Sequence, residues 1–159
     1  MRLLSVFCAI WFALMGGFFF AFSTTVMPAL HQVPPSEGLH AMQQINETVT
    51  NPGFAAGFWI AILLATAGLF AALIRRPRGW LWLLGGCLLY IVGAFMVTAV
   101  GNVPLNKALA PIALDGAGSA ASWAHYEAHW GLLNYIRMFS AFLAAFLTLM
   151  PLISTLNDN

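Results

Sequence analysis

Four apolar runs, each about 20 residues long, constrain the fold of this chain more than any other feature. They cover about residues 3–27, 54–74, 80–100 and 132–153. A helix of that length crosses the hydrocarbon core of a membrane. The chain is 61% hydrophobic and only 7% charged, which excludes an ordinary soluble domain. The sequence therefore predicts an all-α integral membrane protein in contact with the lipid bilayer. Its net charge of +1 gives no indication of nucleic-acid binding.

The order of the runs and the placement of the arginines predict the topology. Short connections favour an up-down-up-down four-helix bundle that forms one transmembrane domain, residues 1–159. Arg2 precedes the first run, and three arginines lie between the second and third: Arg75, Arg76 and Arg78. The positive-inside rule places these arginines, and with them both termini, in the cytoplasm. We expect longer outer loops at 31–53 and 101–122, and a location in the bacterial inner membrane.

The first outer loop carries the pattern of a short amphipathic helix. Ser36 follows two prolines and is suited to cap its N-terminus. One face has the row Leu39, Met42, Asn46 and Val49, and the other has His40, Gln43, Gln44 and Glu47. We expect the helix to lie on the outer surface of the bundle with its polar face in water. Asn46 is an amide in an apolar row, so it needs a polar partner and is a candidate contact for the last helix.

Proline and asparagine mark the expected ends of the helices. Asn51 followed by Pro52 predicts the start of the second span, with Asn51 as the cap. Pro28 predicts the exit from the first span, and Pro104 the end of the third. The segment 110–122 is rich in glycine, alanine and serine, which predicts a flexible outer loop.

The stretch from Trp123 to Arg137 places polar and aromatic residues in one row of a helix. The row continues into the last apolar run as small residues, and its members are Trp123, Glu127, Trp130, Asn134, Arg137, Ala141, Ala144 or Ala145, and Thr148. Small residues on a membrane helix mark the face that contacts other helices, so the row points inward. Arg137 is then a charge inside a membrane segment, which indicates a functional site.

Two interpretations of Arg137 follow from the sequence. In the first, the side chain reaches the membrane surface or pairs with a carboxylate, and it only locks helices together. In the second, it is a fixed positive charge that holds an anionic or phenolate oxygen. Neutral donors around that oxygen would come from four amides: Asn134, Asn46, Asn102 and Asn106.

Aromatic and acidic residues complete the predicted site. Trp123 and Trp130 form flat walls for an aromatic ligand in the functional interpretation, and they are membrane-interface residues in the other. The phenylalanine-rich stretch GFFFAFSTTVMPAL fits lipid contact and core filling, with the wall of a ligand pocket as the alternative. Glu127 lies too far along the helix to pair with Arg137, so it pairs with Lys107 or accepts a proton.

Four histidines lie on the outer side of the predicted bundle: His31, His40, His125 and His129. His125 and His129 are four residues apart, a spacing that can chelate one metal ion. A metal or haem held by these outer-side histidines is therefore the alternative to a site without a cofactor. Because the pair occupies a different helix face from the Arg137 row, we favour the site without a metal.

Four motifs occur in order at the ends of the apolar runs. They are FxxxVMPAL, MQxINETVTNPGF, TxxxNVPLN and WxxYxxxWxxxNxxR. In this combination the chain resembles the anthrone oxygenase family of small four-span membrane proteins. The positions that carry the resemblance are Asn46, Pro52, Asn102, Pro104, Asn106, Trp123, Tyr126, Trp130, Asn134 and Arg137. His125 and His129 do not belong to the pattern.

The resemblance implies oxidation of a flat, lipophilic aromatic compound. Fungal members of the family are associated with the oxidation of anthrones to anthraquinones. Loss of a proton from an anthrone gives an enolate that reacts with oxygen without a metal. By this resemblance, Arg137 and the asparagines would stabilise the oxyanion, the aromatic rings would hold the planar substrate, and Glu127 or Tyr126 would accept the proton.

Two other classes of function stay open on the sequence. A non-catalytic membrane subunit would use its small-residue faces to assemble with a second copy or with another membrane partner. A carrier of small molecules would have helices broken near mid-membrane, which the sequence does not indicate. A site for a lipophilic small molecule predicts a cavity shared by Arg137, Asn102 and Asn106, whereas a packing subunit predicts none.

Overall fold

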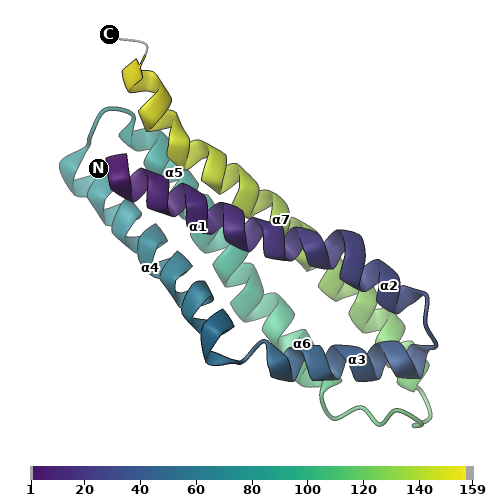
Figure 1. Ribbon diagram of the computed structural model, residues 1–159. Coiled ribbons are helices and arrows are strands. Elements are labelled where there is room, and N and C mark those ends of the chain that lie inside the picture. The colour runs from purple at the N-terminus through teal and green to yellow at the C-terminus, as the bar shows by residue number, and fades with distance from the viewer. Residues whose placement is uncertain (1, 157–159) are drawn as a thin grey trace.

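The computed structural model describes residues 2–156, with side chains described as far as residue 152. All regular structure among these residues is helical. Four long segments form a bundle in which consecutive segments run in opposite directions (Figure 1). Each is long and apolar enough to cross a membrane: Arg2–His31, Pro52–Arg75, Trp80–Leu109 and Ser119–Leu152. The predicted all-α membrane bundle is confirmed. Residues 1 and 157–159 of the predicted domain lie outside the described residues.

Two of the four segments are built from several helical pieces. The first consists of α1 (Arg2–Ala21), the π-helical turn η1 (Phe22–Val26) and α2 (Met27–His31). The third consists of α5 (Trp80–Leu89), the π-helical η2 (Tyr90–Met96) and η3 (Thr98–Asn102), and α6 (Val103–Leu109). The second and fourth are single helices, α4 (Pro52–Arg75) and α7 (Ser119–Leu156). A further helix, α3 (Pro35–Thr48), connects the first two segments.

Pro28 and Pro104 do not end their helices, which corrects the sequence prediction. Each follows a π-helical turn by two residues, η1 before Pro28 and η3 before Pro104. In a regular α-helix, a proline ring clashes with the preceding turn and removes one hydrogen bond. The wider π turn accommodates the ring, so the chain continues as helix to His31 and to Leu109. Both segments therefore extend beyond their predicted limits at residues 27 and 100.

The last segment is also longer than predicted. α7 begins at Ser119, so the predicted flexible loop 110–122 is helical in its final residues. With 38 residues, α7 is about 57 Å long, longer than the ~30 Å hydrocarbon core of a bilayer. Part of α7 therefore extends past the hydrocarbon core, and α3 packs against it there.

Helix α3 crosses the end of the bundle opposite the N-terminus and packs on α7, α6 and α2 (Figure 1). Its apolar row is buried at Leu39 and Met42, as predicted. Ser36 is not the cap, because the helix already begins at Pro35 and the cap position is occupied by Pro34. Since proline is favoured in the first turn, Pro35 starts the helix without a side-chain cap.

Gln43 of α3 does not simply face water, which is a second correction. Its side-chain amide donates to the backbone carbonyls of Leu109 and Ile112, both at 3.0 Å, and of Ala110 at 3.3 Å. The last carbonyls of a helix have no partner within the helix. Gln43 supplies one and thereby holds the end of α6 against α3.

The predicted start of α4 is confirmed. The Asn51 side-chain oxygen accepts a hydrogen bond from the backbone N–H of Phe54 at 3.0 Å, and Pro52 is the first helical residue. This cap fixes the point at which the chain turns from α3 into the membrane, so it also fixes where the aromatic residues of α4 begin.

Small residues let α7 approach its neighbours closely. Ala141, Ala144 and Thr148 of the inner row are fully buried. Gly86 of α5 lies so near α7 that a Cβ there would come within 2.9 Å of the Ala144 carbonyl oxygen. The predicted inward row is confirmed, and it places Arg137 in the interior of the bundle.

Candidate ligand-binding site

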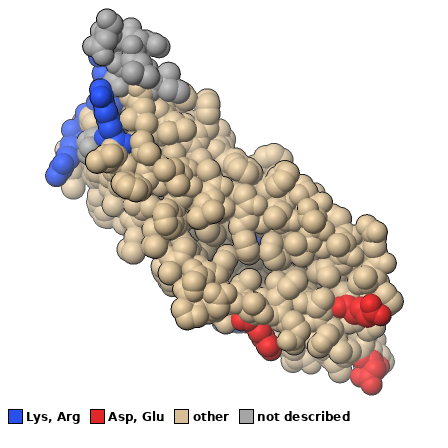
Figure 2. Space-filling view, in the orientation of Figure 1, with Lys and Arg blue, Asp and Glu red and all other residues tan. Residues whose placement is uncertain are grey.

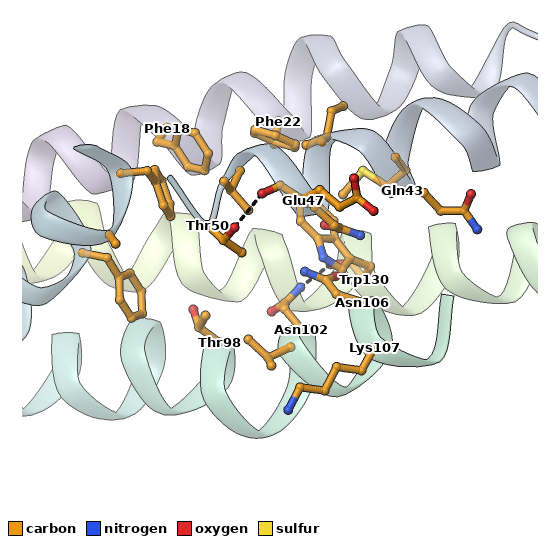
Figure 3. Close-up of a pocket in the computed structure, with 18 of the residues that line it drawn as sticks. Phe18, Phe22, Gln43, Glu47, Thr50, Thr98, Asn102, Asn106, Lys107 and Trp130 are labelled. Carbon is orange, nitrogen blue, oxygen red and sulfur yellow. Dashed lines mark hydrogen bonds between the residues drawn. The ribbon is translucent and has the colours of Figure 1, made fainter. Parts of the chain in front are cut away.

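A cavity of ≈ 730 Å³ lies between the helices, next to α3 (Figure 3). Its volume is in the range of sites for small organic molecules, about 300–1,000 Å³. Its aromatic lining comes from α1, η1 and α4: Phe18, Phe19, Phe22, Phe54, Phe58 and Trp59. Its polar lining comes mainly from α3, η3, α6 and α7, and includes Asn46, Glu47, Thr98, Asn102, Asn106, Lys107, Trp130 and Arg137. One wall is therefore flat and apolar, and the other carries hydrogen-bonding groups.

Arg137 is the buried cation of this site, with only 5% of its surface exposed. Its Nη2 donates to Asn134 Oδ1 at 2.6 Å, and its Nη1 donates to Thr98 Oγ1 at 3.3 Å. Its Cζ lies 4.5 Å from the centre of the Phe19 ring and 5.0 Å from that of Trp130. Two ring faces and two neutral acceptors therefore hold the guanidinium in place.

None of these contacts neutralises the charge of Arg137. No carboxylate among the described residues forms an ion pair with it. Among the described residues, Glu47 of α3 supplies the one carboxylate that lines the cavity, and its side chain is exposed. A charge buried in a membrane bundle without a counter-ion is costly. The cavity is therefore electropositive at its inner end and suited to an oxygen that carries negative charge.

Four buried side-chain atoms have no hydrogen-bond partner among the described residues, and all four belong to residues that line the cavity. They are Asn46 Nδ2, Trp130 Nε1, Arg137 Nε and Asn102 Oδ1. Buried polar groups in native proteins are nearly always paired. The first three atoms are donors and the last is an acceptor. A ligand that accepts hydrogen bonds at its oxygens and donates at least one would match this set of unpartnered atoms.

Asn134 supports the arginine but does not line the cavity. Its Nδ2 donates to the Phe19 carbonyl at 2.8 Å and to Ser23 Oγ at 2.7 Å, and its Oδ1 receives Arg137. The sequence prediction treated Asn134 as a donor to a ligand oxygen. With both amide hydrogens already bonded, Asn134 instead ties α7 to α1 and orients the guanidinium.

Asn102 and Asn106 line the cavity with Arg137, as a ligand site requires. Asn102 Nδ2 donates to the Trp130 carbonyl at 3.2 Å, which leaves its oxygen for a ligand. Asn106 Oδ1 accepts the Tyr126 hydroxyl at 2.9 Å. Tyr126 and Trp123 stack behind this layer, with ring centres 5.8 Å apart, and neither lines the cavity. Of the aromatic residues predicted on α7, only Trp130 can touch a ligand there.

A family model described as anthrone oxygenase matches residues 47–147. The chain belongs to the anthrone oxygenase family. The resemblance drawn from the four motifs is thereby confirmed. Comparisons with curated proteins and with solved structures found no match. The family match covers the cavity residues of α4, η3, α6 and α7, whereas Asn46 and the phenylalanines of α1 precede it.

Glu127 lies outside the cavity of this anthrone oxygenase family member. Its Oε1 pairs with His31 Nδ1 at 2.9 Å, so the predicted partner Lys107 is not the one it contacts. Lys107 is exposed and lines the cavity edge instead. The pair between Glu127 and His31 joins α7 to the end of α2, which is a packing role.

The outer histidines are not assembled into a metal site. The rings of His125 and His129 stack with centres 4.0 Å apart, and His129 Nδ1 lies 2.8 Å from the His125 carbonyl oxygen. Both residues are exposed. Among the described residues, no group of three or more His, Cys, Asp or Glu side chains is placed to hold a metal ion.

Three groups of cavity residues were missed or left undecided by the sequence analysis. The phenylalanines of α1 form an aromatic wall, which was the alternative to lipid contact. Thr98 contacts Arg137, and its signal was its place one helical turn before Asn102 in the TxxxNVPLN motif. Glu47 was expected to be solvated only, yet it also lines the cavity edge.

Proposed function

We propose that this protein is a membrane oxidoreductase that binds a lipophilic phenolic compound in the cavity and oxidises it. The observation that carries the proposal is the buried Arg137. Among the described residues it has no carboxylate partner, and three further polar atoms of the cavity residues have no hydrogen-bond partner. The membership of the anthrone oxygenase family supports the same chemistry. A packing subunit has no use for a cavity bordered by an uncompensated charge, so we favour the enzyme over that alternative.

The proposed reaction removes a proton from the carbon that lies opposite the carbonyl in an anthrone-type ring. The resulting negative charge spreads to the carbonyl oxygen, where Arg137 Nε and Trp130 Nε1 supply fixed donors. The electron-rich carbon then forms a bond to molecular oxygen. Loss of water from the peroxide gives the quinone, so one oxygen atom enters the new carbonyl and the other leaves as water. Preorganised donors stabilise the anion before oxygen reacts.

Glu47 is the proposed acceptor of that proton. It is the one carboxylate among the described residues that lines the cavity, and in the sequence it follows Asn46, whose amide nitrogen has no partner there. Glu127 was the candidate from sequence, but its pairing with His31 places it away from the cavity. A base at the exposed edge of the cavity can pass its proton to water, which favours Glu47 over a buried group.

The arginines support a topology in which the cavity faces away from the cytoplasm. Arginine side chains gather at the end where α1 begins, and Asp and Glu side chains lie toward the opposite end (Figure 2). Arg2 and the arginines between α4 and α5 belong to the basic end. We infer from the positive-inside rule that this end, with both termini, lies in the cytoplasm of a bacterial cell. The substrate would then bind in the outer half of the inner membrane.

The test is oxidation of 1,8-dihydroxyanthrone by the purified full chain in lipid nanodiscs, followed by quinone absorbance and oxygen uptake. We expect a rate above that of empty nanodiscs, and we expect Arg137→Gln to return it to that background. Arg75→Gln, at the opposite end of α4, serves as the matched control and should keep the full rate. A rate no higher than that of empty nanodiscs, or an unchanged rate for Arg137→Gln, would overturn the proposal.

A further inference from the structure

The cavity has an open side, and the exposure of its lining residues locates it. The lining phenylalanines of α1 and η1 are buried or half-buried. The exposed lining residues come from the end of α3, the α3–α4 connection and the first half of α4, and from α6 with the residue that follows it: Gln44, Glu47, Thr50, Trp59, Val103, Lys107 and Ala110. The opening is therefore bordered by the N-terminal part of α4 on one side and by α6 on the other.

The packing of α4 explains why this side is open. Farther along the helix, Phe58 and Trp59 pack on Phe95 of η2, with ring centres 5.4 and 6.1 Å apart. Nearer its N-terminus, α4 does not pack on η3 or α6 to a comparable extent, and it diverges from the bundle (Figure 1). The aromatic cluster at Phe95 thus closes the inner end of the opening, and Ala55 leaves room beside it.

The border of the opening is charged at one end and apolar at the other. Glu47 and Lys107 are at the charged end, and the close-up places them on opposite sides of the cavity (Figure 3). Trp59 is 57% exposed and Val103 is 36% exposed. Trp59 lies seven residues after Pro52, about 10 Å along α4. The apolar part of the border therefore lies within the membrane-spanning part of α4, where it meets lipid chains and not water.

The four unpartnered atoms narrow the chemistry of the head group that the cavity can hold. Three donors, on Asn46, Trp130 and Arg137, need acceptor oxygens. Asn102 Oδ1 needs a donor, which a phenolic hydroxyl supplies and the phosphate diester of a phospholipid does not. The rings of Phe19 and Trp130, both within 5.0 Å of the guanidinium carbon and both in the cavity lining, favour a flat aromatic head.

We propose that the substrate is a phenol that carries an aliphatic tail. It enters from the bilayer between α4 and α6, and in the bound state its tail lies in that opening. The head lies among the unpartnered donors and Asn102, and the tail passes Ala55 and Val103 into the lipid. This inference rests on the proposed function, which requires a phenolic ligand but says nothing of a tail or of the route.

The test compares decylhydroquinone with methylhydroquinone, which share a head group and differ in the tail. Binding to the purified full chain in nanodiscs is measured without oxygen by equilibrium dialysis of radiolabelled compound, and empty nanodiscs provide the background for partition into lipid. Ala55→Trp should weaken binding of the decyl compound by about tenfold or more, whereas binding of the methyl compound should change by less than about twofold. Ala56→Trp is the matched control, because Ala56 is exposed and does not line the cavity. Ala56→Trp should leave the binding of both compounds unchanged.

Val103→Trp should obstruct the same opening from α6. Val100→Trp is its control, because Val100 is 68% exposed and does not line the cavity. Unchanged binding of the decyl compound in both Ala55→Trp and Val103→Trp overturns the proposal, as does an equal loss for the two compounds. A bound phospholipid that Arg137→Gln releases overturns it in favour of a lipid site. Failure of both compounds to bind the unaltered protein also overturns this inference, whereas the absence of 1,8-dihydroxyanthrone oxidation removes the proposed function itself, so the two failures are distinguishable.

Discussion

Replacement of Arg137 by methionine separates a functional arginine from a structural one. Methionine is apolar, flexible and of similar length, so it can fill the same space. The change removes the hydrogen bonds to Asn134 at 2.6 Å and to Thr98 at 3.3 Å, together with the contacts to two ring faces. It also removes a charge that has no counter-ion among the described residues.

The stability lost with the contacts of Arg137 and the stability gained by removing its buried charge are of similar size. A hydrogen bond to a charged group contributes about 1.5–3 kcal/mol and a cation over a ring about 0.5–2 kcal/mol, so the two bonds and two ring contacts amount to roughly 4–10 kcal/mol. The bond to Thr98 is long, at 3.3 Å, which places the sum toward the lower end of that range. The effective cost of keeping one ion out of water in a protein is several kcal/mol. We therefore expect Arg137→Met to change the free energy of unfolding by no more than about 2 kcal/mol, while ligand binding and oxidation are lost.

The assay is unfolding in mixed detergent micelles, followed by circular dichroism, alongside binding of decylhydroquinone. Loss of one partner of a structural buried ion pair costs about 3–5 kcal/mol. A loss of that size in Arg137→Met would refute the reasoning, because it would mean that the arginine serves mainly to hold the helices together. Retained binding of decylhydroquinone by Arg137→Met would also refute the reasoning, because the ligand would then not need the guanidinium.

Asn134→Leu provides the control for this prediction. It leaves the guanidinium buried without its 2.6 Å acceptor and also removes the bonds to Phe19 and Ser23. We expect a loss of about 2–4 kcal/mol, larger than that of Arg137→Met. In the double variant, part of that loss should be recovered, because the unpaired charge is gone. Simple addition of the two single effects would contradict the coupling.

Three further predictions concern the cavity and the packing around it. Asn102→Leu should weaken binding of a phenol by about tenfold but weaken binding of its methyl ether much less, measured by dialysis with both ligands, because only the phenol donates to Asn102. Glu47→Gln should lower the oxidation rate by about 10²-fold with the Kd unchanged, whereas Glu127→Gln should change neither; equal rates for the two variants would exclude Glu47 as the base. Gly86→Ala should destabilise the protein by about 1–3 kcal/mol in the unfolding assay, because a Cβ would meet the carbonyl of α7 at 2.9 Å. Gly85→Ala, which meets nothing within 4 Å, should not.

Much of the fold was predictable because it depends on local patterns. Hydropathy over about 20 residues identified the four spans. The spacing of Trp130, Asn134 and Arg137 predicted one buried row, and Asn51 with Pro52 predicted the start of α4. The ends of the first and third segments were not predicted correctly. A proline near the end of an apolar run normally stops a helix, and the π turns that let the helices pass Pro28 and Pro104 have no local sequence signature.

The residue types of the candidate site were also predictable, but their individual roles were not. The sequence identified Arg137, Asn102 and Asn106 as residues that would share a cavity, and they do. Glu127 looked like the carboxylate of that site, yet it is held by His31, 96 positions away. Nothing in the spacing along α7 indicates which residue of α2 its neighbour will be.

The sequence by itself determined the class of this protein: a helical membrane bundle with a charged residue facing inward and the motifs of one family. Only the tertiary structure decided which polar atoms are left for a ligand. Asn134 is fully bonded because Phe19 and Ser23, 115 and 111 positions away, take both of its amide hydrogens. Asn102, one helical turn beyond Thr98, lines the cavity, and its Oδ1 has no hydrogen-bond partner among the described residues. Periodicity assigns a side chain to a face, but its hydrogen bonds depend on what the other helices place opposite it.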